Sequence, residues 1–600
     1  MDKKNTTIGV LLLLAAFASF YFTSRPGPQT TPTGLPVAAA PTTPTTPATP
    51  TPATTTPAVP ANDAAFAAVV SDNANATVTT LANDYVELRL TDFGGAISDV
   101  AFKKYPAAHG STAPFVFNET HAAPILAFNG FPGLDQSTRF QLVSATPTEV
   151  VYRTIFENRI EVTRRYILPA ANDASADPYR IRHETTFRNL TAQIAPLPNV
   201  VNLGTSALVS SNDAGLYLNV ASYDGDKPTV IDRGELEGGG FLNWIGASKN
   251  PPKSVIEQAG KVEWATVKNQ FFASIFTPEK PGTGIVVRRV ELPPLAGTSH
   301  TNIGLTGAIR LDLPVLPANG TTSFAGDLYV GPKEYTRLAK FSHNEDKVMQ
   351  YDRYFFNRIF FSGYVAPALN WLMNGMHSFV GNWGIAIILM TLLLKVVSLP
   401  FTLAASRSAK RMQKMQPLMQ AVREKYKDNP QKMNQATMEL FKEHKVNPMG
   451  GCLPVLITIP LFVGFYSMLQ GTAELRFQGF LWAHDLSAPD TIGHIFGLPI
   501  NIMPILMGAT MLFQMRLTPS PSIDSAQAQV FKFMPFLFTM ICYNFSCALA
   551  LYSTINGLFT IGQQLVVNKY TQDATPTPLG VPSGTGKSGK PIKNVTPQKK

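Results

Sequence analysis

The sequence WGIAIILMTLLLKVVSLPFT, residues 383–402, is an apolar run that contains one cation, Lys395. As an α-helix this run would cover about 30 Å, the thickness of the hydrocarbon core of a bilayer. A lysine at the centre of a membrane helix costs about 2.5–3.5 kcal/mol on insertion scales, so such a residue usually faces water or a partner. Two interpretations follow: Lys395 lines a wet functional cavity, or its ammonium group extends to the nearby membrane surface.

The composition favours several domains of different character. The chain has 600 residues, 48 prolines and a net charge of +10. Apolar runs gather at the N-terminus and after about residue 350, and the section between them has the composition of a soluble domain. We therefore expect a multi-domain membrane protein with a large water-exposed part. The cysteines all lie in apolar runs, so no disulfide is expected in the soluble section; they are Cys452, Cys542 and Cys547.

The N-terminus has the pattern of a signal sequence or a signal anchor. Residues 8–22, IGVLLLLAAFASFYF, follow Lys3 and Lys4. Because no turn residue interrupts the run, we expect an uncleaved anchor helix over residues 1–24. The positive-inside rule then places the N-terminus in the cytoplasm and the next segment outside. Residues 25–62 are rich in Pro, Thr and Ala and are expected to form an extended linker.

Residues 63–340 show the alternation of polar and apolar side chains that is typical of β-strands. The alternation recurs between turn residues, for example in IEVTRRY (160–166). It predicts a mostly antiparallel β-sandwich. The histidines of this domain have no ligand or nucleophile spacing; they are His109, His121, His183 and His300. His183 and Glu184 are an acid/base candidate, but adjacent strand residues point to opposite faces, so no catalysis is expected.

Residues 341–382 are rich in aromatic side chains but are interrupted by Asn and Pro. This composition favours an interfacial amphipathic helix in the headgroup plane. Residues 404–447 then carry ten Lys and Arg against four Asp and Glu, which predicts a cytoplasmic loop. Because Pro430 interrupts its helical pattern, we expect a helical hairpin.

One face of this hairpin carries Met412, Met415 and Met419 at helical spacing. These methionines either join the two arms or receive apolar client segments, since methionine is flexible and polarizable. Arg411 and Lys414 add positive charge beside them. Hydrophobic nascent segments, anionic lipids and ribosomal RNA would all suit such a surface, and the charges alone do not choose between them.

The chain after the hairpin contains further apolar runs. Together with residues 383–402 they predict a five-helix transmembrane core over residues 383–570, with further spans at 450–469, 496–515, 530–543 and 546–567. The loop at 470–495 has one cation, Arg476, and is expected outside. The tail, residues 571–600, is basic and without periodicity, so we expect it to be disordered and cytoplasmic.

Several long motifs resemble the YidC family of membrane protein insertases: GNWGIAIILMTLLLK (381–395), KMQPLMQAVREKY (414–426), KVNPMGGCLPVLITIPLFVGFYSML (445–469) and LWAHDLSAPD (481–490). The anchor, the linker and the β-domain, which includes LYVGP (328–332), resemble the Gram-negative form. The resemblance implies an insertase in the cell inner membrane. It also implies that the β-domain is periplasmic and has a supersandwich fold related to carbohydrate mutarotases.

The resemblance also implies a hydrated groove that is open to cytoplasm and lipid. Lys395 occupies the position of its basic residue, where many members carry Arg; Lys keeps the charge but lacks the planar fork. Thr391 matches a polar groove position, and Tyr552 matches a tyrosine that contacts substrate. Ser553 replaces a second tyrosine, and Ser546-Cys547-Ala548 departs from the family pattern.

The implied partners are nascent membrane proteins, the Sec translocon, anionic lipids and, through the hairpin and tail, the ribosome; no DNA partner is expected. No cofactor or enzymatic activity is expected, and no glycine-rich phosphate loop occurs in the sequence. A membrane transporter or channel would also use an intramembrane Lys, but the paired repeats of transporters are not found. A membrane-tethered carbohydrate-binding or mutarotase-like protein is the second alternative, and it would group acid/base side chains in a cleft.

Overall fold

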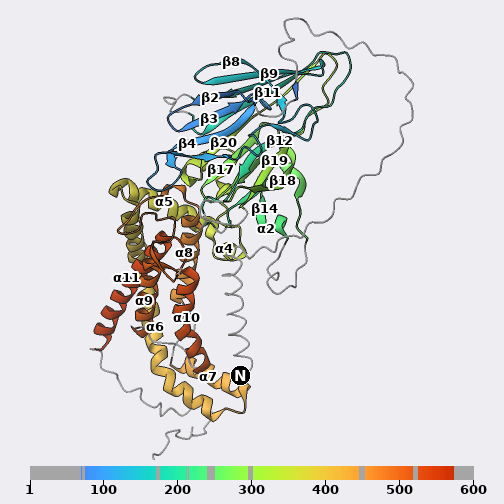
Figure 1. Cartoon of the computed structure of the whole chain (residues 1–600). Helices are drawn as coiled ribbons and strands as arrows, with labels where there is room; N and C mark the ends of the chain where they lie inside the picture. Colours follow the sequence, from blue (N-terminus) through green and yellow to red (C-terminus); the bar gives the residue numbers. More distant parts are fainter. Residues whose placement is uncertain are drawn as a thin grey trace, which may run out of the picture.

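The computed structural model describes residues 69–70, 75–169, 176–210, 213, 215–238, 251–294, 302–444, 453–496, 498–517 and 525–572. The expected anchor (1–24), the linker (25–62) and all but the first two residues of the tail (571–600) lie outside the described residues. Figure 1 shows a β-domain at one end of a helical bundle and α7 at the other end.

The β-domain is built on a nine-stranded antiparallel sheet. Its strand order is β14-β13-β16-β17-β20-β11-β10-β9-β8. The bounds in chain order are β8 (Gln141–Ala145), β9 (Glu149–Phe156), β10 (Ile160–Ile167), β11 (Arg180–Asn189), β13 (Asn219–Tyr223), β14 (Pro228–Asp232), β16 (Trp264–Lys268), β17 (Phe272–Pro278) and β20 (Thr321–Pro332).

A five-stranded sheet has the order β15-β18-β19-β12-β6. Its strands β12 and β19 pack against β13, β16 and β17, in the half of the nine-stranded sheet that begins with β14. The five strands are β6 (Phe128–Asn129), β12 (Val200–Ser206), β15 (Val255–Val262), β18 (Gly282–Leu292) and β19 (Asn302–Arg310). A four-stranded sheet consists of β2 (Val78–Ala82), β3 (Val86–Thr91), β4 (Ala96–Pro106) and β5 (Pro114–Phe117). Strands β1 (Val69–Val70) and β7 (Thr138–Arg139) pair with each other. Three short helices complete the domain: α2 (Arg233–Glu237), α3 (Tyr335–Leu338) and the 3-10 helix η4 (Glu345–Met349).

Every strand pair in these sheets is antiparallel, which confirms the predicted β-domain. In β10, for example, Ile160, Val162, Arg164 and Tyr166 are buried, while the residues between them are less buried. This alternation puts the apolar face of each strand into the core between the sheets.

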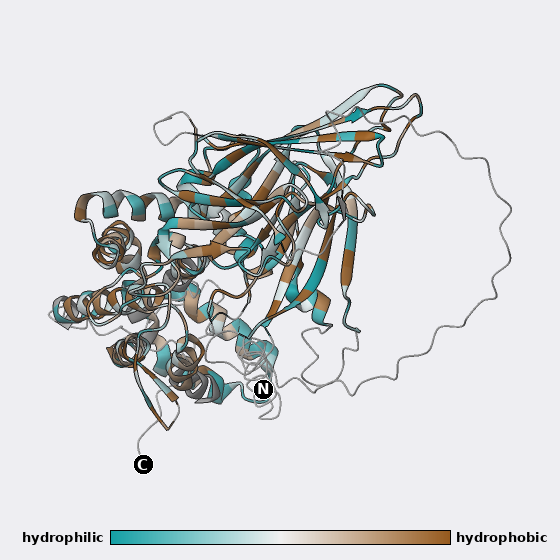
Figure 2. Ribbon diagram, turned by 45° about the horizontal axis from the view of Figure 1, so that its top comes forward, coloured by the Kyte–Doolittle hydropathy of each residue, from teal (hydrophilic) through white to brown (hydrophobic). Residues whose placement is uncertain are grey.

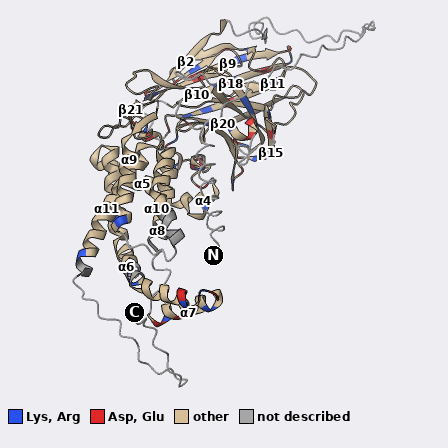
Figure 3. Cartoon of the chain, turned by 60° about the horizontal axis from the view of Figure 1, so that its bottom comes forward, with Lys and Arg blue, Asp and Glu red and all other residues tan. Residues whose placement is uncertain are grey.

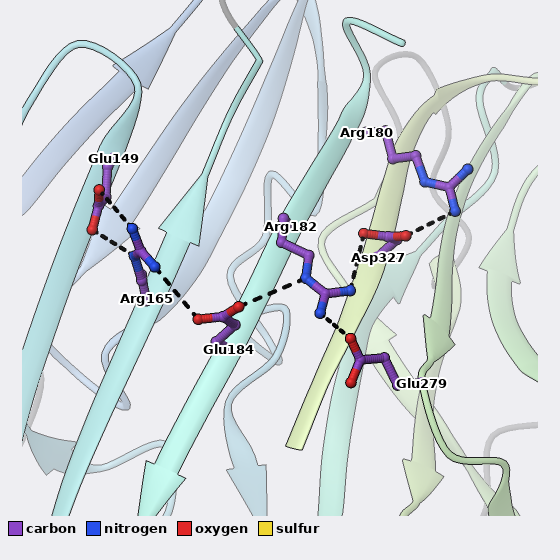
Figure 4. A network of polar contacts seen from close by, with 7 residues as sticks. All are labelled: Glu149, Arg165, Arg180, Arg182, Glu184, Glu279 and Asp327. Atoms are coloured by element: carbon purple, nitrogen blue, oxygen red, sulfur yellow. Dashed lines mark hydrogen bonds and ion pairs between the residues drawn. The ribbon is translucent and has the colours of Figure 1, made fainter. Parts of the chain in front are cut away.

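The two members of the acid/base candidate lie on opposite faces of β11. His183 is fully buried, and burial together with the neighbouring Arg164 holds its pKa well below the ordinary value. Glu184 faces outward and forms ion pairs with Arg165 (3.6 Å) and Arg182 (3.9 Å), within a surface network that crosses several strands (Figure 4). The two side chains therefore do not work together.

The helical part begins with α4 (Phe355–Ile359) and α5 (Ser362–Val380) and continues through α6 (Trp383–Lys425) and α7 (Pro430–Glu443). It then contains α8 (Leu453–Gln470), the 3-10 helix η6 (Ala473–Leu475), α9 (Ile502–Leu517), α10 (Ser525–Cys542) and α11 (Cys547–Gln572). Helix α6 packs against α5 and α11, and α9 packs against α10 and α11. Brown, hydrophobic residues predominate along these helices (Figure 2), and the bundle is largely free of charged side chains compared with its two ends (Figure 3).

Among the described residues, one stretch, Trp383–Ser408, is both long and apolar enough to cross a membrane. Shorter apolar helices occur at Ile502–Leu517 and Phe533–Cys542. Five spans therefore remain a prediction.

The span expected at 496–515 begins too early. Leu498–Asn501 is strand β22, which pairs with β21 (Thr491–Ile495), and α9 starts at Ile502. Pro499 lacks an amide hydrogen and Ile500 is β-branched, so this segment suits a hairpin strand better than a helix interior.

Candidate functional site

Lys395 lies between two helices and is hydrogen-bonded across them. Its ammonium Nζ on α6 donates to the Thr560 hydroxyl on α11 at 2.9 Å. The Thr560 hydroxyl in turn donates to the backbone carbonyl of Asn556 at 2.7 Å. The cation is thus held by a neutral hydroxyl that is itself oriented by its own helix.

A second polar contact joins the same helices nearer to the hairpin. The Gln563 side-chain amide on α11 donates to the Thr402 hydroxyl on α6 at 3.0 Å. Ser398 lies between Lys395 and Thr402 along the same face of α6, since these positions are three and four residues apart. We call Lys395, Ser398, Thr402, Thr560 and Gln563 the polar seam.

Lys395 lies near the middle of the apolar stretch that runs from Trp383 to Ser408. At 1.5 Å per residue this stretch is about 39 Å long. Within the described part of the chain no carboxylate pairs with Lys395, whose contact is the Thr560 hydroxyl.

The polar groups of the other groove residues implied by the family resemblance are buried or bonded within their own helix, and are less accessible to a client than Lys395. The Thr391 hydroxyl donates to the carbonyl of Ile387 at 2.6 Å, and the residue is buried. The Tyr552 ring is buried and stacks on Phe465, with 3.9 Å between ring centroids. The Ser553 hydroxyl is buried and has no hydrogen-bond partner among the described residues.

The methionines of the helical hairpin lie at the interface between its two arms, α6 and α7. Met412, Met415 and Met419 are between 2% and 6% exposed and form one cluster with Phe441 of α7. In this arrangement their side chains hold the arms together, and a client would reach them only if the arms separated. Arg411 is exposed beside the cluster, and the side chain of Lys414 lies outside the described residues.

The end of the bundle near the β-domain is covered by the loop after α8. Backbone amides of Cys547 and Ala548, at the start of α11, donate to the carbonyls of Ala488 (2.8 Å) and Leu486 (2.9 Å). The Phe480 ring packs so closely on Gly384 of α6 that it leaves no room for a β-carbon at that position. The starts of α6 and α11 are therefore both capped by this loop.

The same loop fixes the β-domain to the bundle. The Arg476 guanidinium donates to the carbonyls of Pro106 (2.6 Å) and Ala107 (3.0 Å) at the end of β4. Its charge lies 5.2 Å and 5.6 Å from the ring centroids of Phe115 and Phe272. A buried, bidentate arginine of this kind gives the contact a defined geometry.

The polar seam contains residues that were not among the predicted site residues. Thr402, Thr560 and Gln563 are ordinary polar side chains, but they recur at helical spacing inside apolar runs. On α6 the series is Thr391, Lys395, Ser398, Thr402 and Ser406. A search for polar side chains three and four residues apart would have found this series from the sequence.

Two family models match the chain. One, described as 60Kd inner membrane protein, matches residues 375–574, and the other, described as YidC periplasmic domain, matches residues 78–362. The polar seam lies within the first match, and the sheets from β2 to β20 lie within the second.

Two solved structures share the arrangement only loosely. An active YidC insertase crystal structure is 16% identical, with a TM-score of 0.31, and the match covers 83% of this chain and 93% of that one. A galactose mutarotase related enzyme from Lactobacillus acidophilus is 8% identical, with a TM-score of 0.28, and the match covers 42% of this chain and 97% of that one. These TM-scores are too low to support a conclusion about function.

Curated relatives that carry the name membrane protein insertase YidC match at higher sequence identity. The protein of Syntrophobacter fumaroxidans is 34% identical, and the match covers 62% of this chain and 65% of that protein. The protein of Tolumonas auensis is 30% identical, and the match covers 83% of this chain and 88% of that protein. On this similarity along almost the whole length of a relative, the chain belongs to the YidC family of membrane protein insertases.

Proposed function

We propose that this chain inserts integral membrane proteins into the inner membrane and helps them to fold, with the polar seam as the wall of a hydrated cationic groove. The observation that carries the proposal is the contact of Lys395 with Thr560. A lysine that were purely structural would gain more from a carboxylate, whereas a hydroxyl leaves its positive charge available to a client.

The mechanism follows from the cost of moving polar groups through hydrocarbon. An unsatisfied polar group in lipid costs several kcal/mol, so the polar flank of a client is the obstacle to insertion. The hydroxyl and amide groups of the polar seam offer hydrogen bonds along part of that path, and Lys395 attracts acidic groups. Burial of the client's apolar helix in lipid supplies the driving force, so no nucleotide is required.

A groove of this kind must not let ions leak through the membrane. The cap formed by the loop after α8 supports closure at the β-domain end, because it covers the starts of α6 and α11. At the other end, α6 continues beyond the apolar stretch into the basic hairpin. We therefore propose that clients enter from the hairpin side and leave sideways into lipid.

The proposed topology has five core spans and an N-terminal anchor, with both termini in the cytoplasm and the β-domain in the periplasm. It is supported by the position of the hairpin and the β-domain at opposite ends of the bundle (Figure 1) and by the excess of Lys and Arg in residues 404–447. The Sec translocon, anionic lipids and the ribosome are proposed partners on the same grounds of charge and family membership.

The hairpin is proposed to receive clients through its methionines when its arms separate. The seam between the arms is small, since Met412, Met415, Met419 and Phe441 make up its buried cluster. Opening it exposes flexible apolar side chains next to the exposed Arg411. In the closed arrangement the same methionines are protected from water.

A reconstitution experiment tests the proposed function. The purified chain is placed in lipid vesicles, a single-span client is synthesised outside them, and insertion is measured as protection of the translocated client tail from protease. The proposal predicts protection that requires the chain and needs no nucleotide beyond that used for synthesis. Protection equal to that in empty vesicles would overturn it, and ion or solute flux without insertion would favour a channel or transporter.

A further inference from the structure

We propose that the hairpin formed by β21 and β22 lies on the bilayer leaflet nearest to the β-domain and inserts its tip among the lipid headgroups and the first part of the chains. We call the described residues 491–496 and 498–501 the apolar hairpin. The exposed surface of the apolar hairpin therefore contacts lipid. The inference rests on the proposed membrane position of α9, which begins directly after the hairpin.

The base of the apolar hairpin is fixed to the helical bundle. The Asn501 side-chain amide donates to the carbonyl of Tyr543 at 2.7 Å, in the bend between α10 and α11. The Tyr543 hydroxyl donates to the carbonyl of Pro499 at 2.7 Å, and the Thr491 hydroxyl donates to Asn501 Oδ1 at 2.6 Å. These bonds hold the base at the end of α9, beside which Figure 3 labels β21.

The tip of the apolar hairpin is fully exposed and hydrophobic. Phe496 is fully exposed, and Ile492, Ile495 and Leu498 are each more than half exposed. Exposed side chains lie on both faces of the ribbon, and an isolated two-stranded hairpin is at best marginally stable in water. Such a surface needs an apolar environment around it.

The backbone conformation of Phe496 is unusual for its residue type. Its φ is +50°, a left-handed conformation that favours Gly or Asn at a hairpin turn. A phenylalanine at this position is strained and presents its ring to solvent. Exposure of this apolar ring to water is unfavourable, and moving the ring among lipids would remove that cost.

Charge and neighbouring residues favour lipid over a protein partner. The apolar hairpin contains no Lys, Arg, Asp or Glu, and the exposed His494 is its one titratable side chain, so it offers little for charge-based recognition of a partner protein. Close to its base, Leu481 is exposed and Trp482 is partly exposed, with the Trp482 indole bonded to Asp490 at 2.9 Å. Tryptophan is enriched at the headgroup level of membranes.

The depth of insertion is limited by the backbone. The outer edges of a two-stranded ribbon carry unpaired amide and carbonyl groups, which cannot enter hydrocarbon. The strands must therefore stay at headgroup depth, and only the side chains of the tip reach the acyl chains. The apolar hairpin is thus an interfacial anchor and not a further span.

Photo-crosslinking of the full chain in lipid nanodiscs and in native inner membranes tests this inference. p-Benzoyl-phenylalanine replaces Phe496, where it is close in shape to the native side chain. The same probe at Phe513 of α9 is the control for lipid exposure, and the probe at Val143 of β8 is the control for an exposed residue of the β-domain. Mass spectrometry then identifies the adducts.

The inference predicts that the probes at 496 and 513 both gain the mass of one phospholipid, whereas the probe at 143 does not. A lipid adduct at 513 without one at 496 would overturn it. A protein adduct at 496 in native membranes, in place of the lipid adduct, would also overturn it and would identify a protein occupant. Absence of a lipid adduct at 513 would instead contradict the proposed membrane position of α9, on which the inference rests.

Discussion

The ammonium group of Lys395 on α6 donates a hydrogen bond to the hydroxyl of Thr560 on α11, although the two residues are 165 positions apart in the chain. This contact places a cation in the middle of the longest apolar helix and gives it a neutral partner. It therefore connects the unusual charge in the sequence to a specific neighbour in the fold.

Replacing Thr560 with Val is expected to slow insertion while leaving the fold intact. Valine keeps the shape but removes the hydroxyl, so Lys395 loses the group that positions it. A hydrogen bond to a charged group contributes about 1.5–3 kcal/mol, so loss of the whole contribution should lower the initial rate of client insertion by about tenfold to about 150-fold. Thr560→Ser keeps the hydroxyl and should insert at close to the wild-type rate.

Thr554→Val is the matched control for this experiment. Thr554 is also on α11, but its hydroxyl bonds to the carbonyl of Ala550 in its own helix, at 2.8 Å, and not to the polar seam. Equal rates for Thr560→Val and Thr554→Val would show that the hydroxyl of Thr560 has no special role.

Substitutions at the hairpin methionines separate packing from client contact. Changing Met412, Met415 and Met419 together to Leu keeps an apolar seam of similar volume, so the arms should stay closed. Changing them to Ser removes buried apolar volume, which costs about 2–5 kcal/mol per site in a well-packed core, so the arms should separate. Protease sensitivity of residues 404–444 measures the separation.

Client crosslinking from a probe at Arg411 completes that test. We expect crosslinking to change in both triple variants, because the Leu variant loses the flexible thioethers and the Ser variant loses the apolar surface. If crosslinking stays as in the wild type in both variants, these methionines only pack the arms together and do not contact clients.

Arg476 is expected to fix the orientation of the β-domain. Arg476→Lys keeps the charge but lacks the planar fork, whose two nitrogens donate separately to the carbonyls of Pro106 and Ala107. The single ammonium nitrogen is expected to lose one of these bonds, at a cost of about 1–3 kcal/mol for the carbonyl left unpaired. Hydrogen exchange should become faster at the end of β4, with little change in the centre of the nine-stranded sheet. Arg89→Lys is the control, since Arg89 is more exposed in its ion pair with Asp99 and should change stability by about 0–1 kcal/mol. Unchanged exchange in Arg476→Lys would contradict this role.

Glu474 should make the same contact sensitive to pH. Both of its carboxylate oxygens are buried without a hydrogen-bond partner among the described residues. Burial, and then the negative charge of Glu334, raise the pKa of Glu474 from 4.5 to about 8, with Arg337 acting in the opposite direction. Tyr105 and Tyr351 also lie close enough to sense its charge.

Between pH 4.5 and about 8, Glu474 thus holds a proton in the contact between the β-domain and the bundle, and would release that proton if the two surfaces separated. The contribution of Glu474 to the stability of this contact is fully present below pH 4.5, falls as the pH rises towards 8, and changes no further above that value. We expect protection from exchange at the end of β4, after correction for the intrinsic pH dependence of amide exchange, to be greater at about pH 5 than at about pH 8 and Glu474→Gln to remove most of that difference. An equally large pH effect in Glu474→Gln would exclude Glu474 as its source.

Local patterns were enough to predict the β-domain and to mark Lys395 as a candidate site residue. The alternation from Ile160 to Tyr166 reflects the burial of one face of a strand. It can be recognised within that strand alone, without knowing which strands pair with it. Lys395 stands out because a charge in an apolar run is costly wherever the partner helix lies.

The remaining features depend on contacts between distant segments. Thr560 is an unremarkable hydroxyl until α11 lies beside α6, and the sequence contains no sign of that pairing. The tip and the second strand of the apolar hairpin fall within the predicted span 496–515 because Phe496, Leu498 and Ile500 are as hydrophobic as the residues of a membrane helix. Its strand pairing and the bonds of Asn501 to Tyr543 decide otherwise.

The most direct test of the central claim is protease protection of a single-span client in membranes depleted of the native insertase and supplied with wild type, Lys395→Arg or Lys395→Ala at equal levels. Because the proposed groove needs a positive charge, Lys395→Arg should insert the client and Lys395→Ala should not. Full insertion by Lys395→Ala would contradict a role for this cation in handling clients and would move attention to Thr391, Tyr552 and the hairpin.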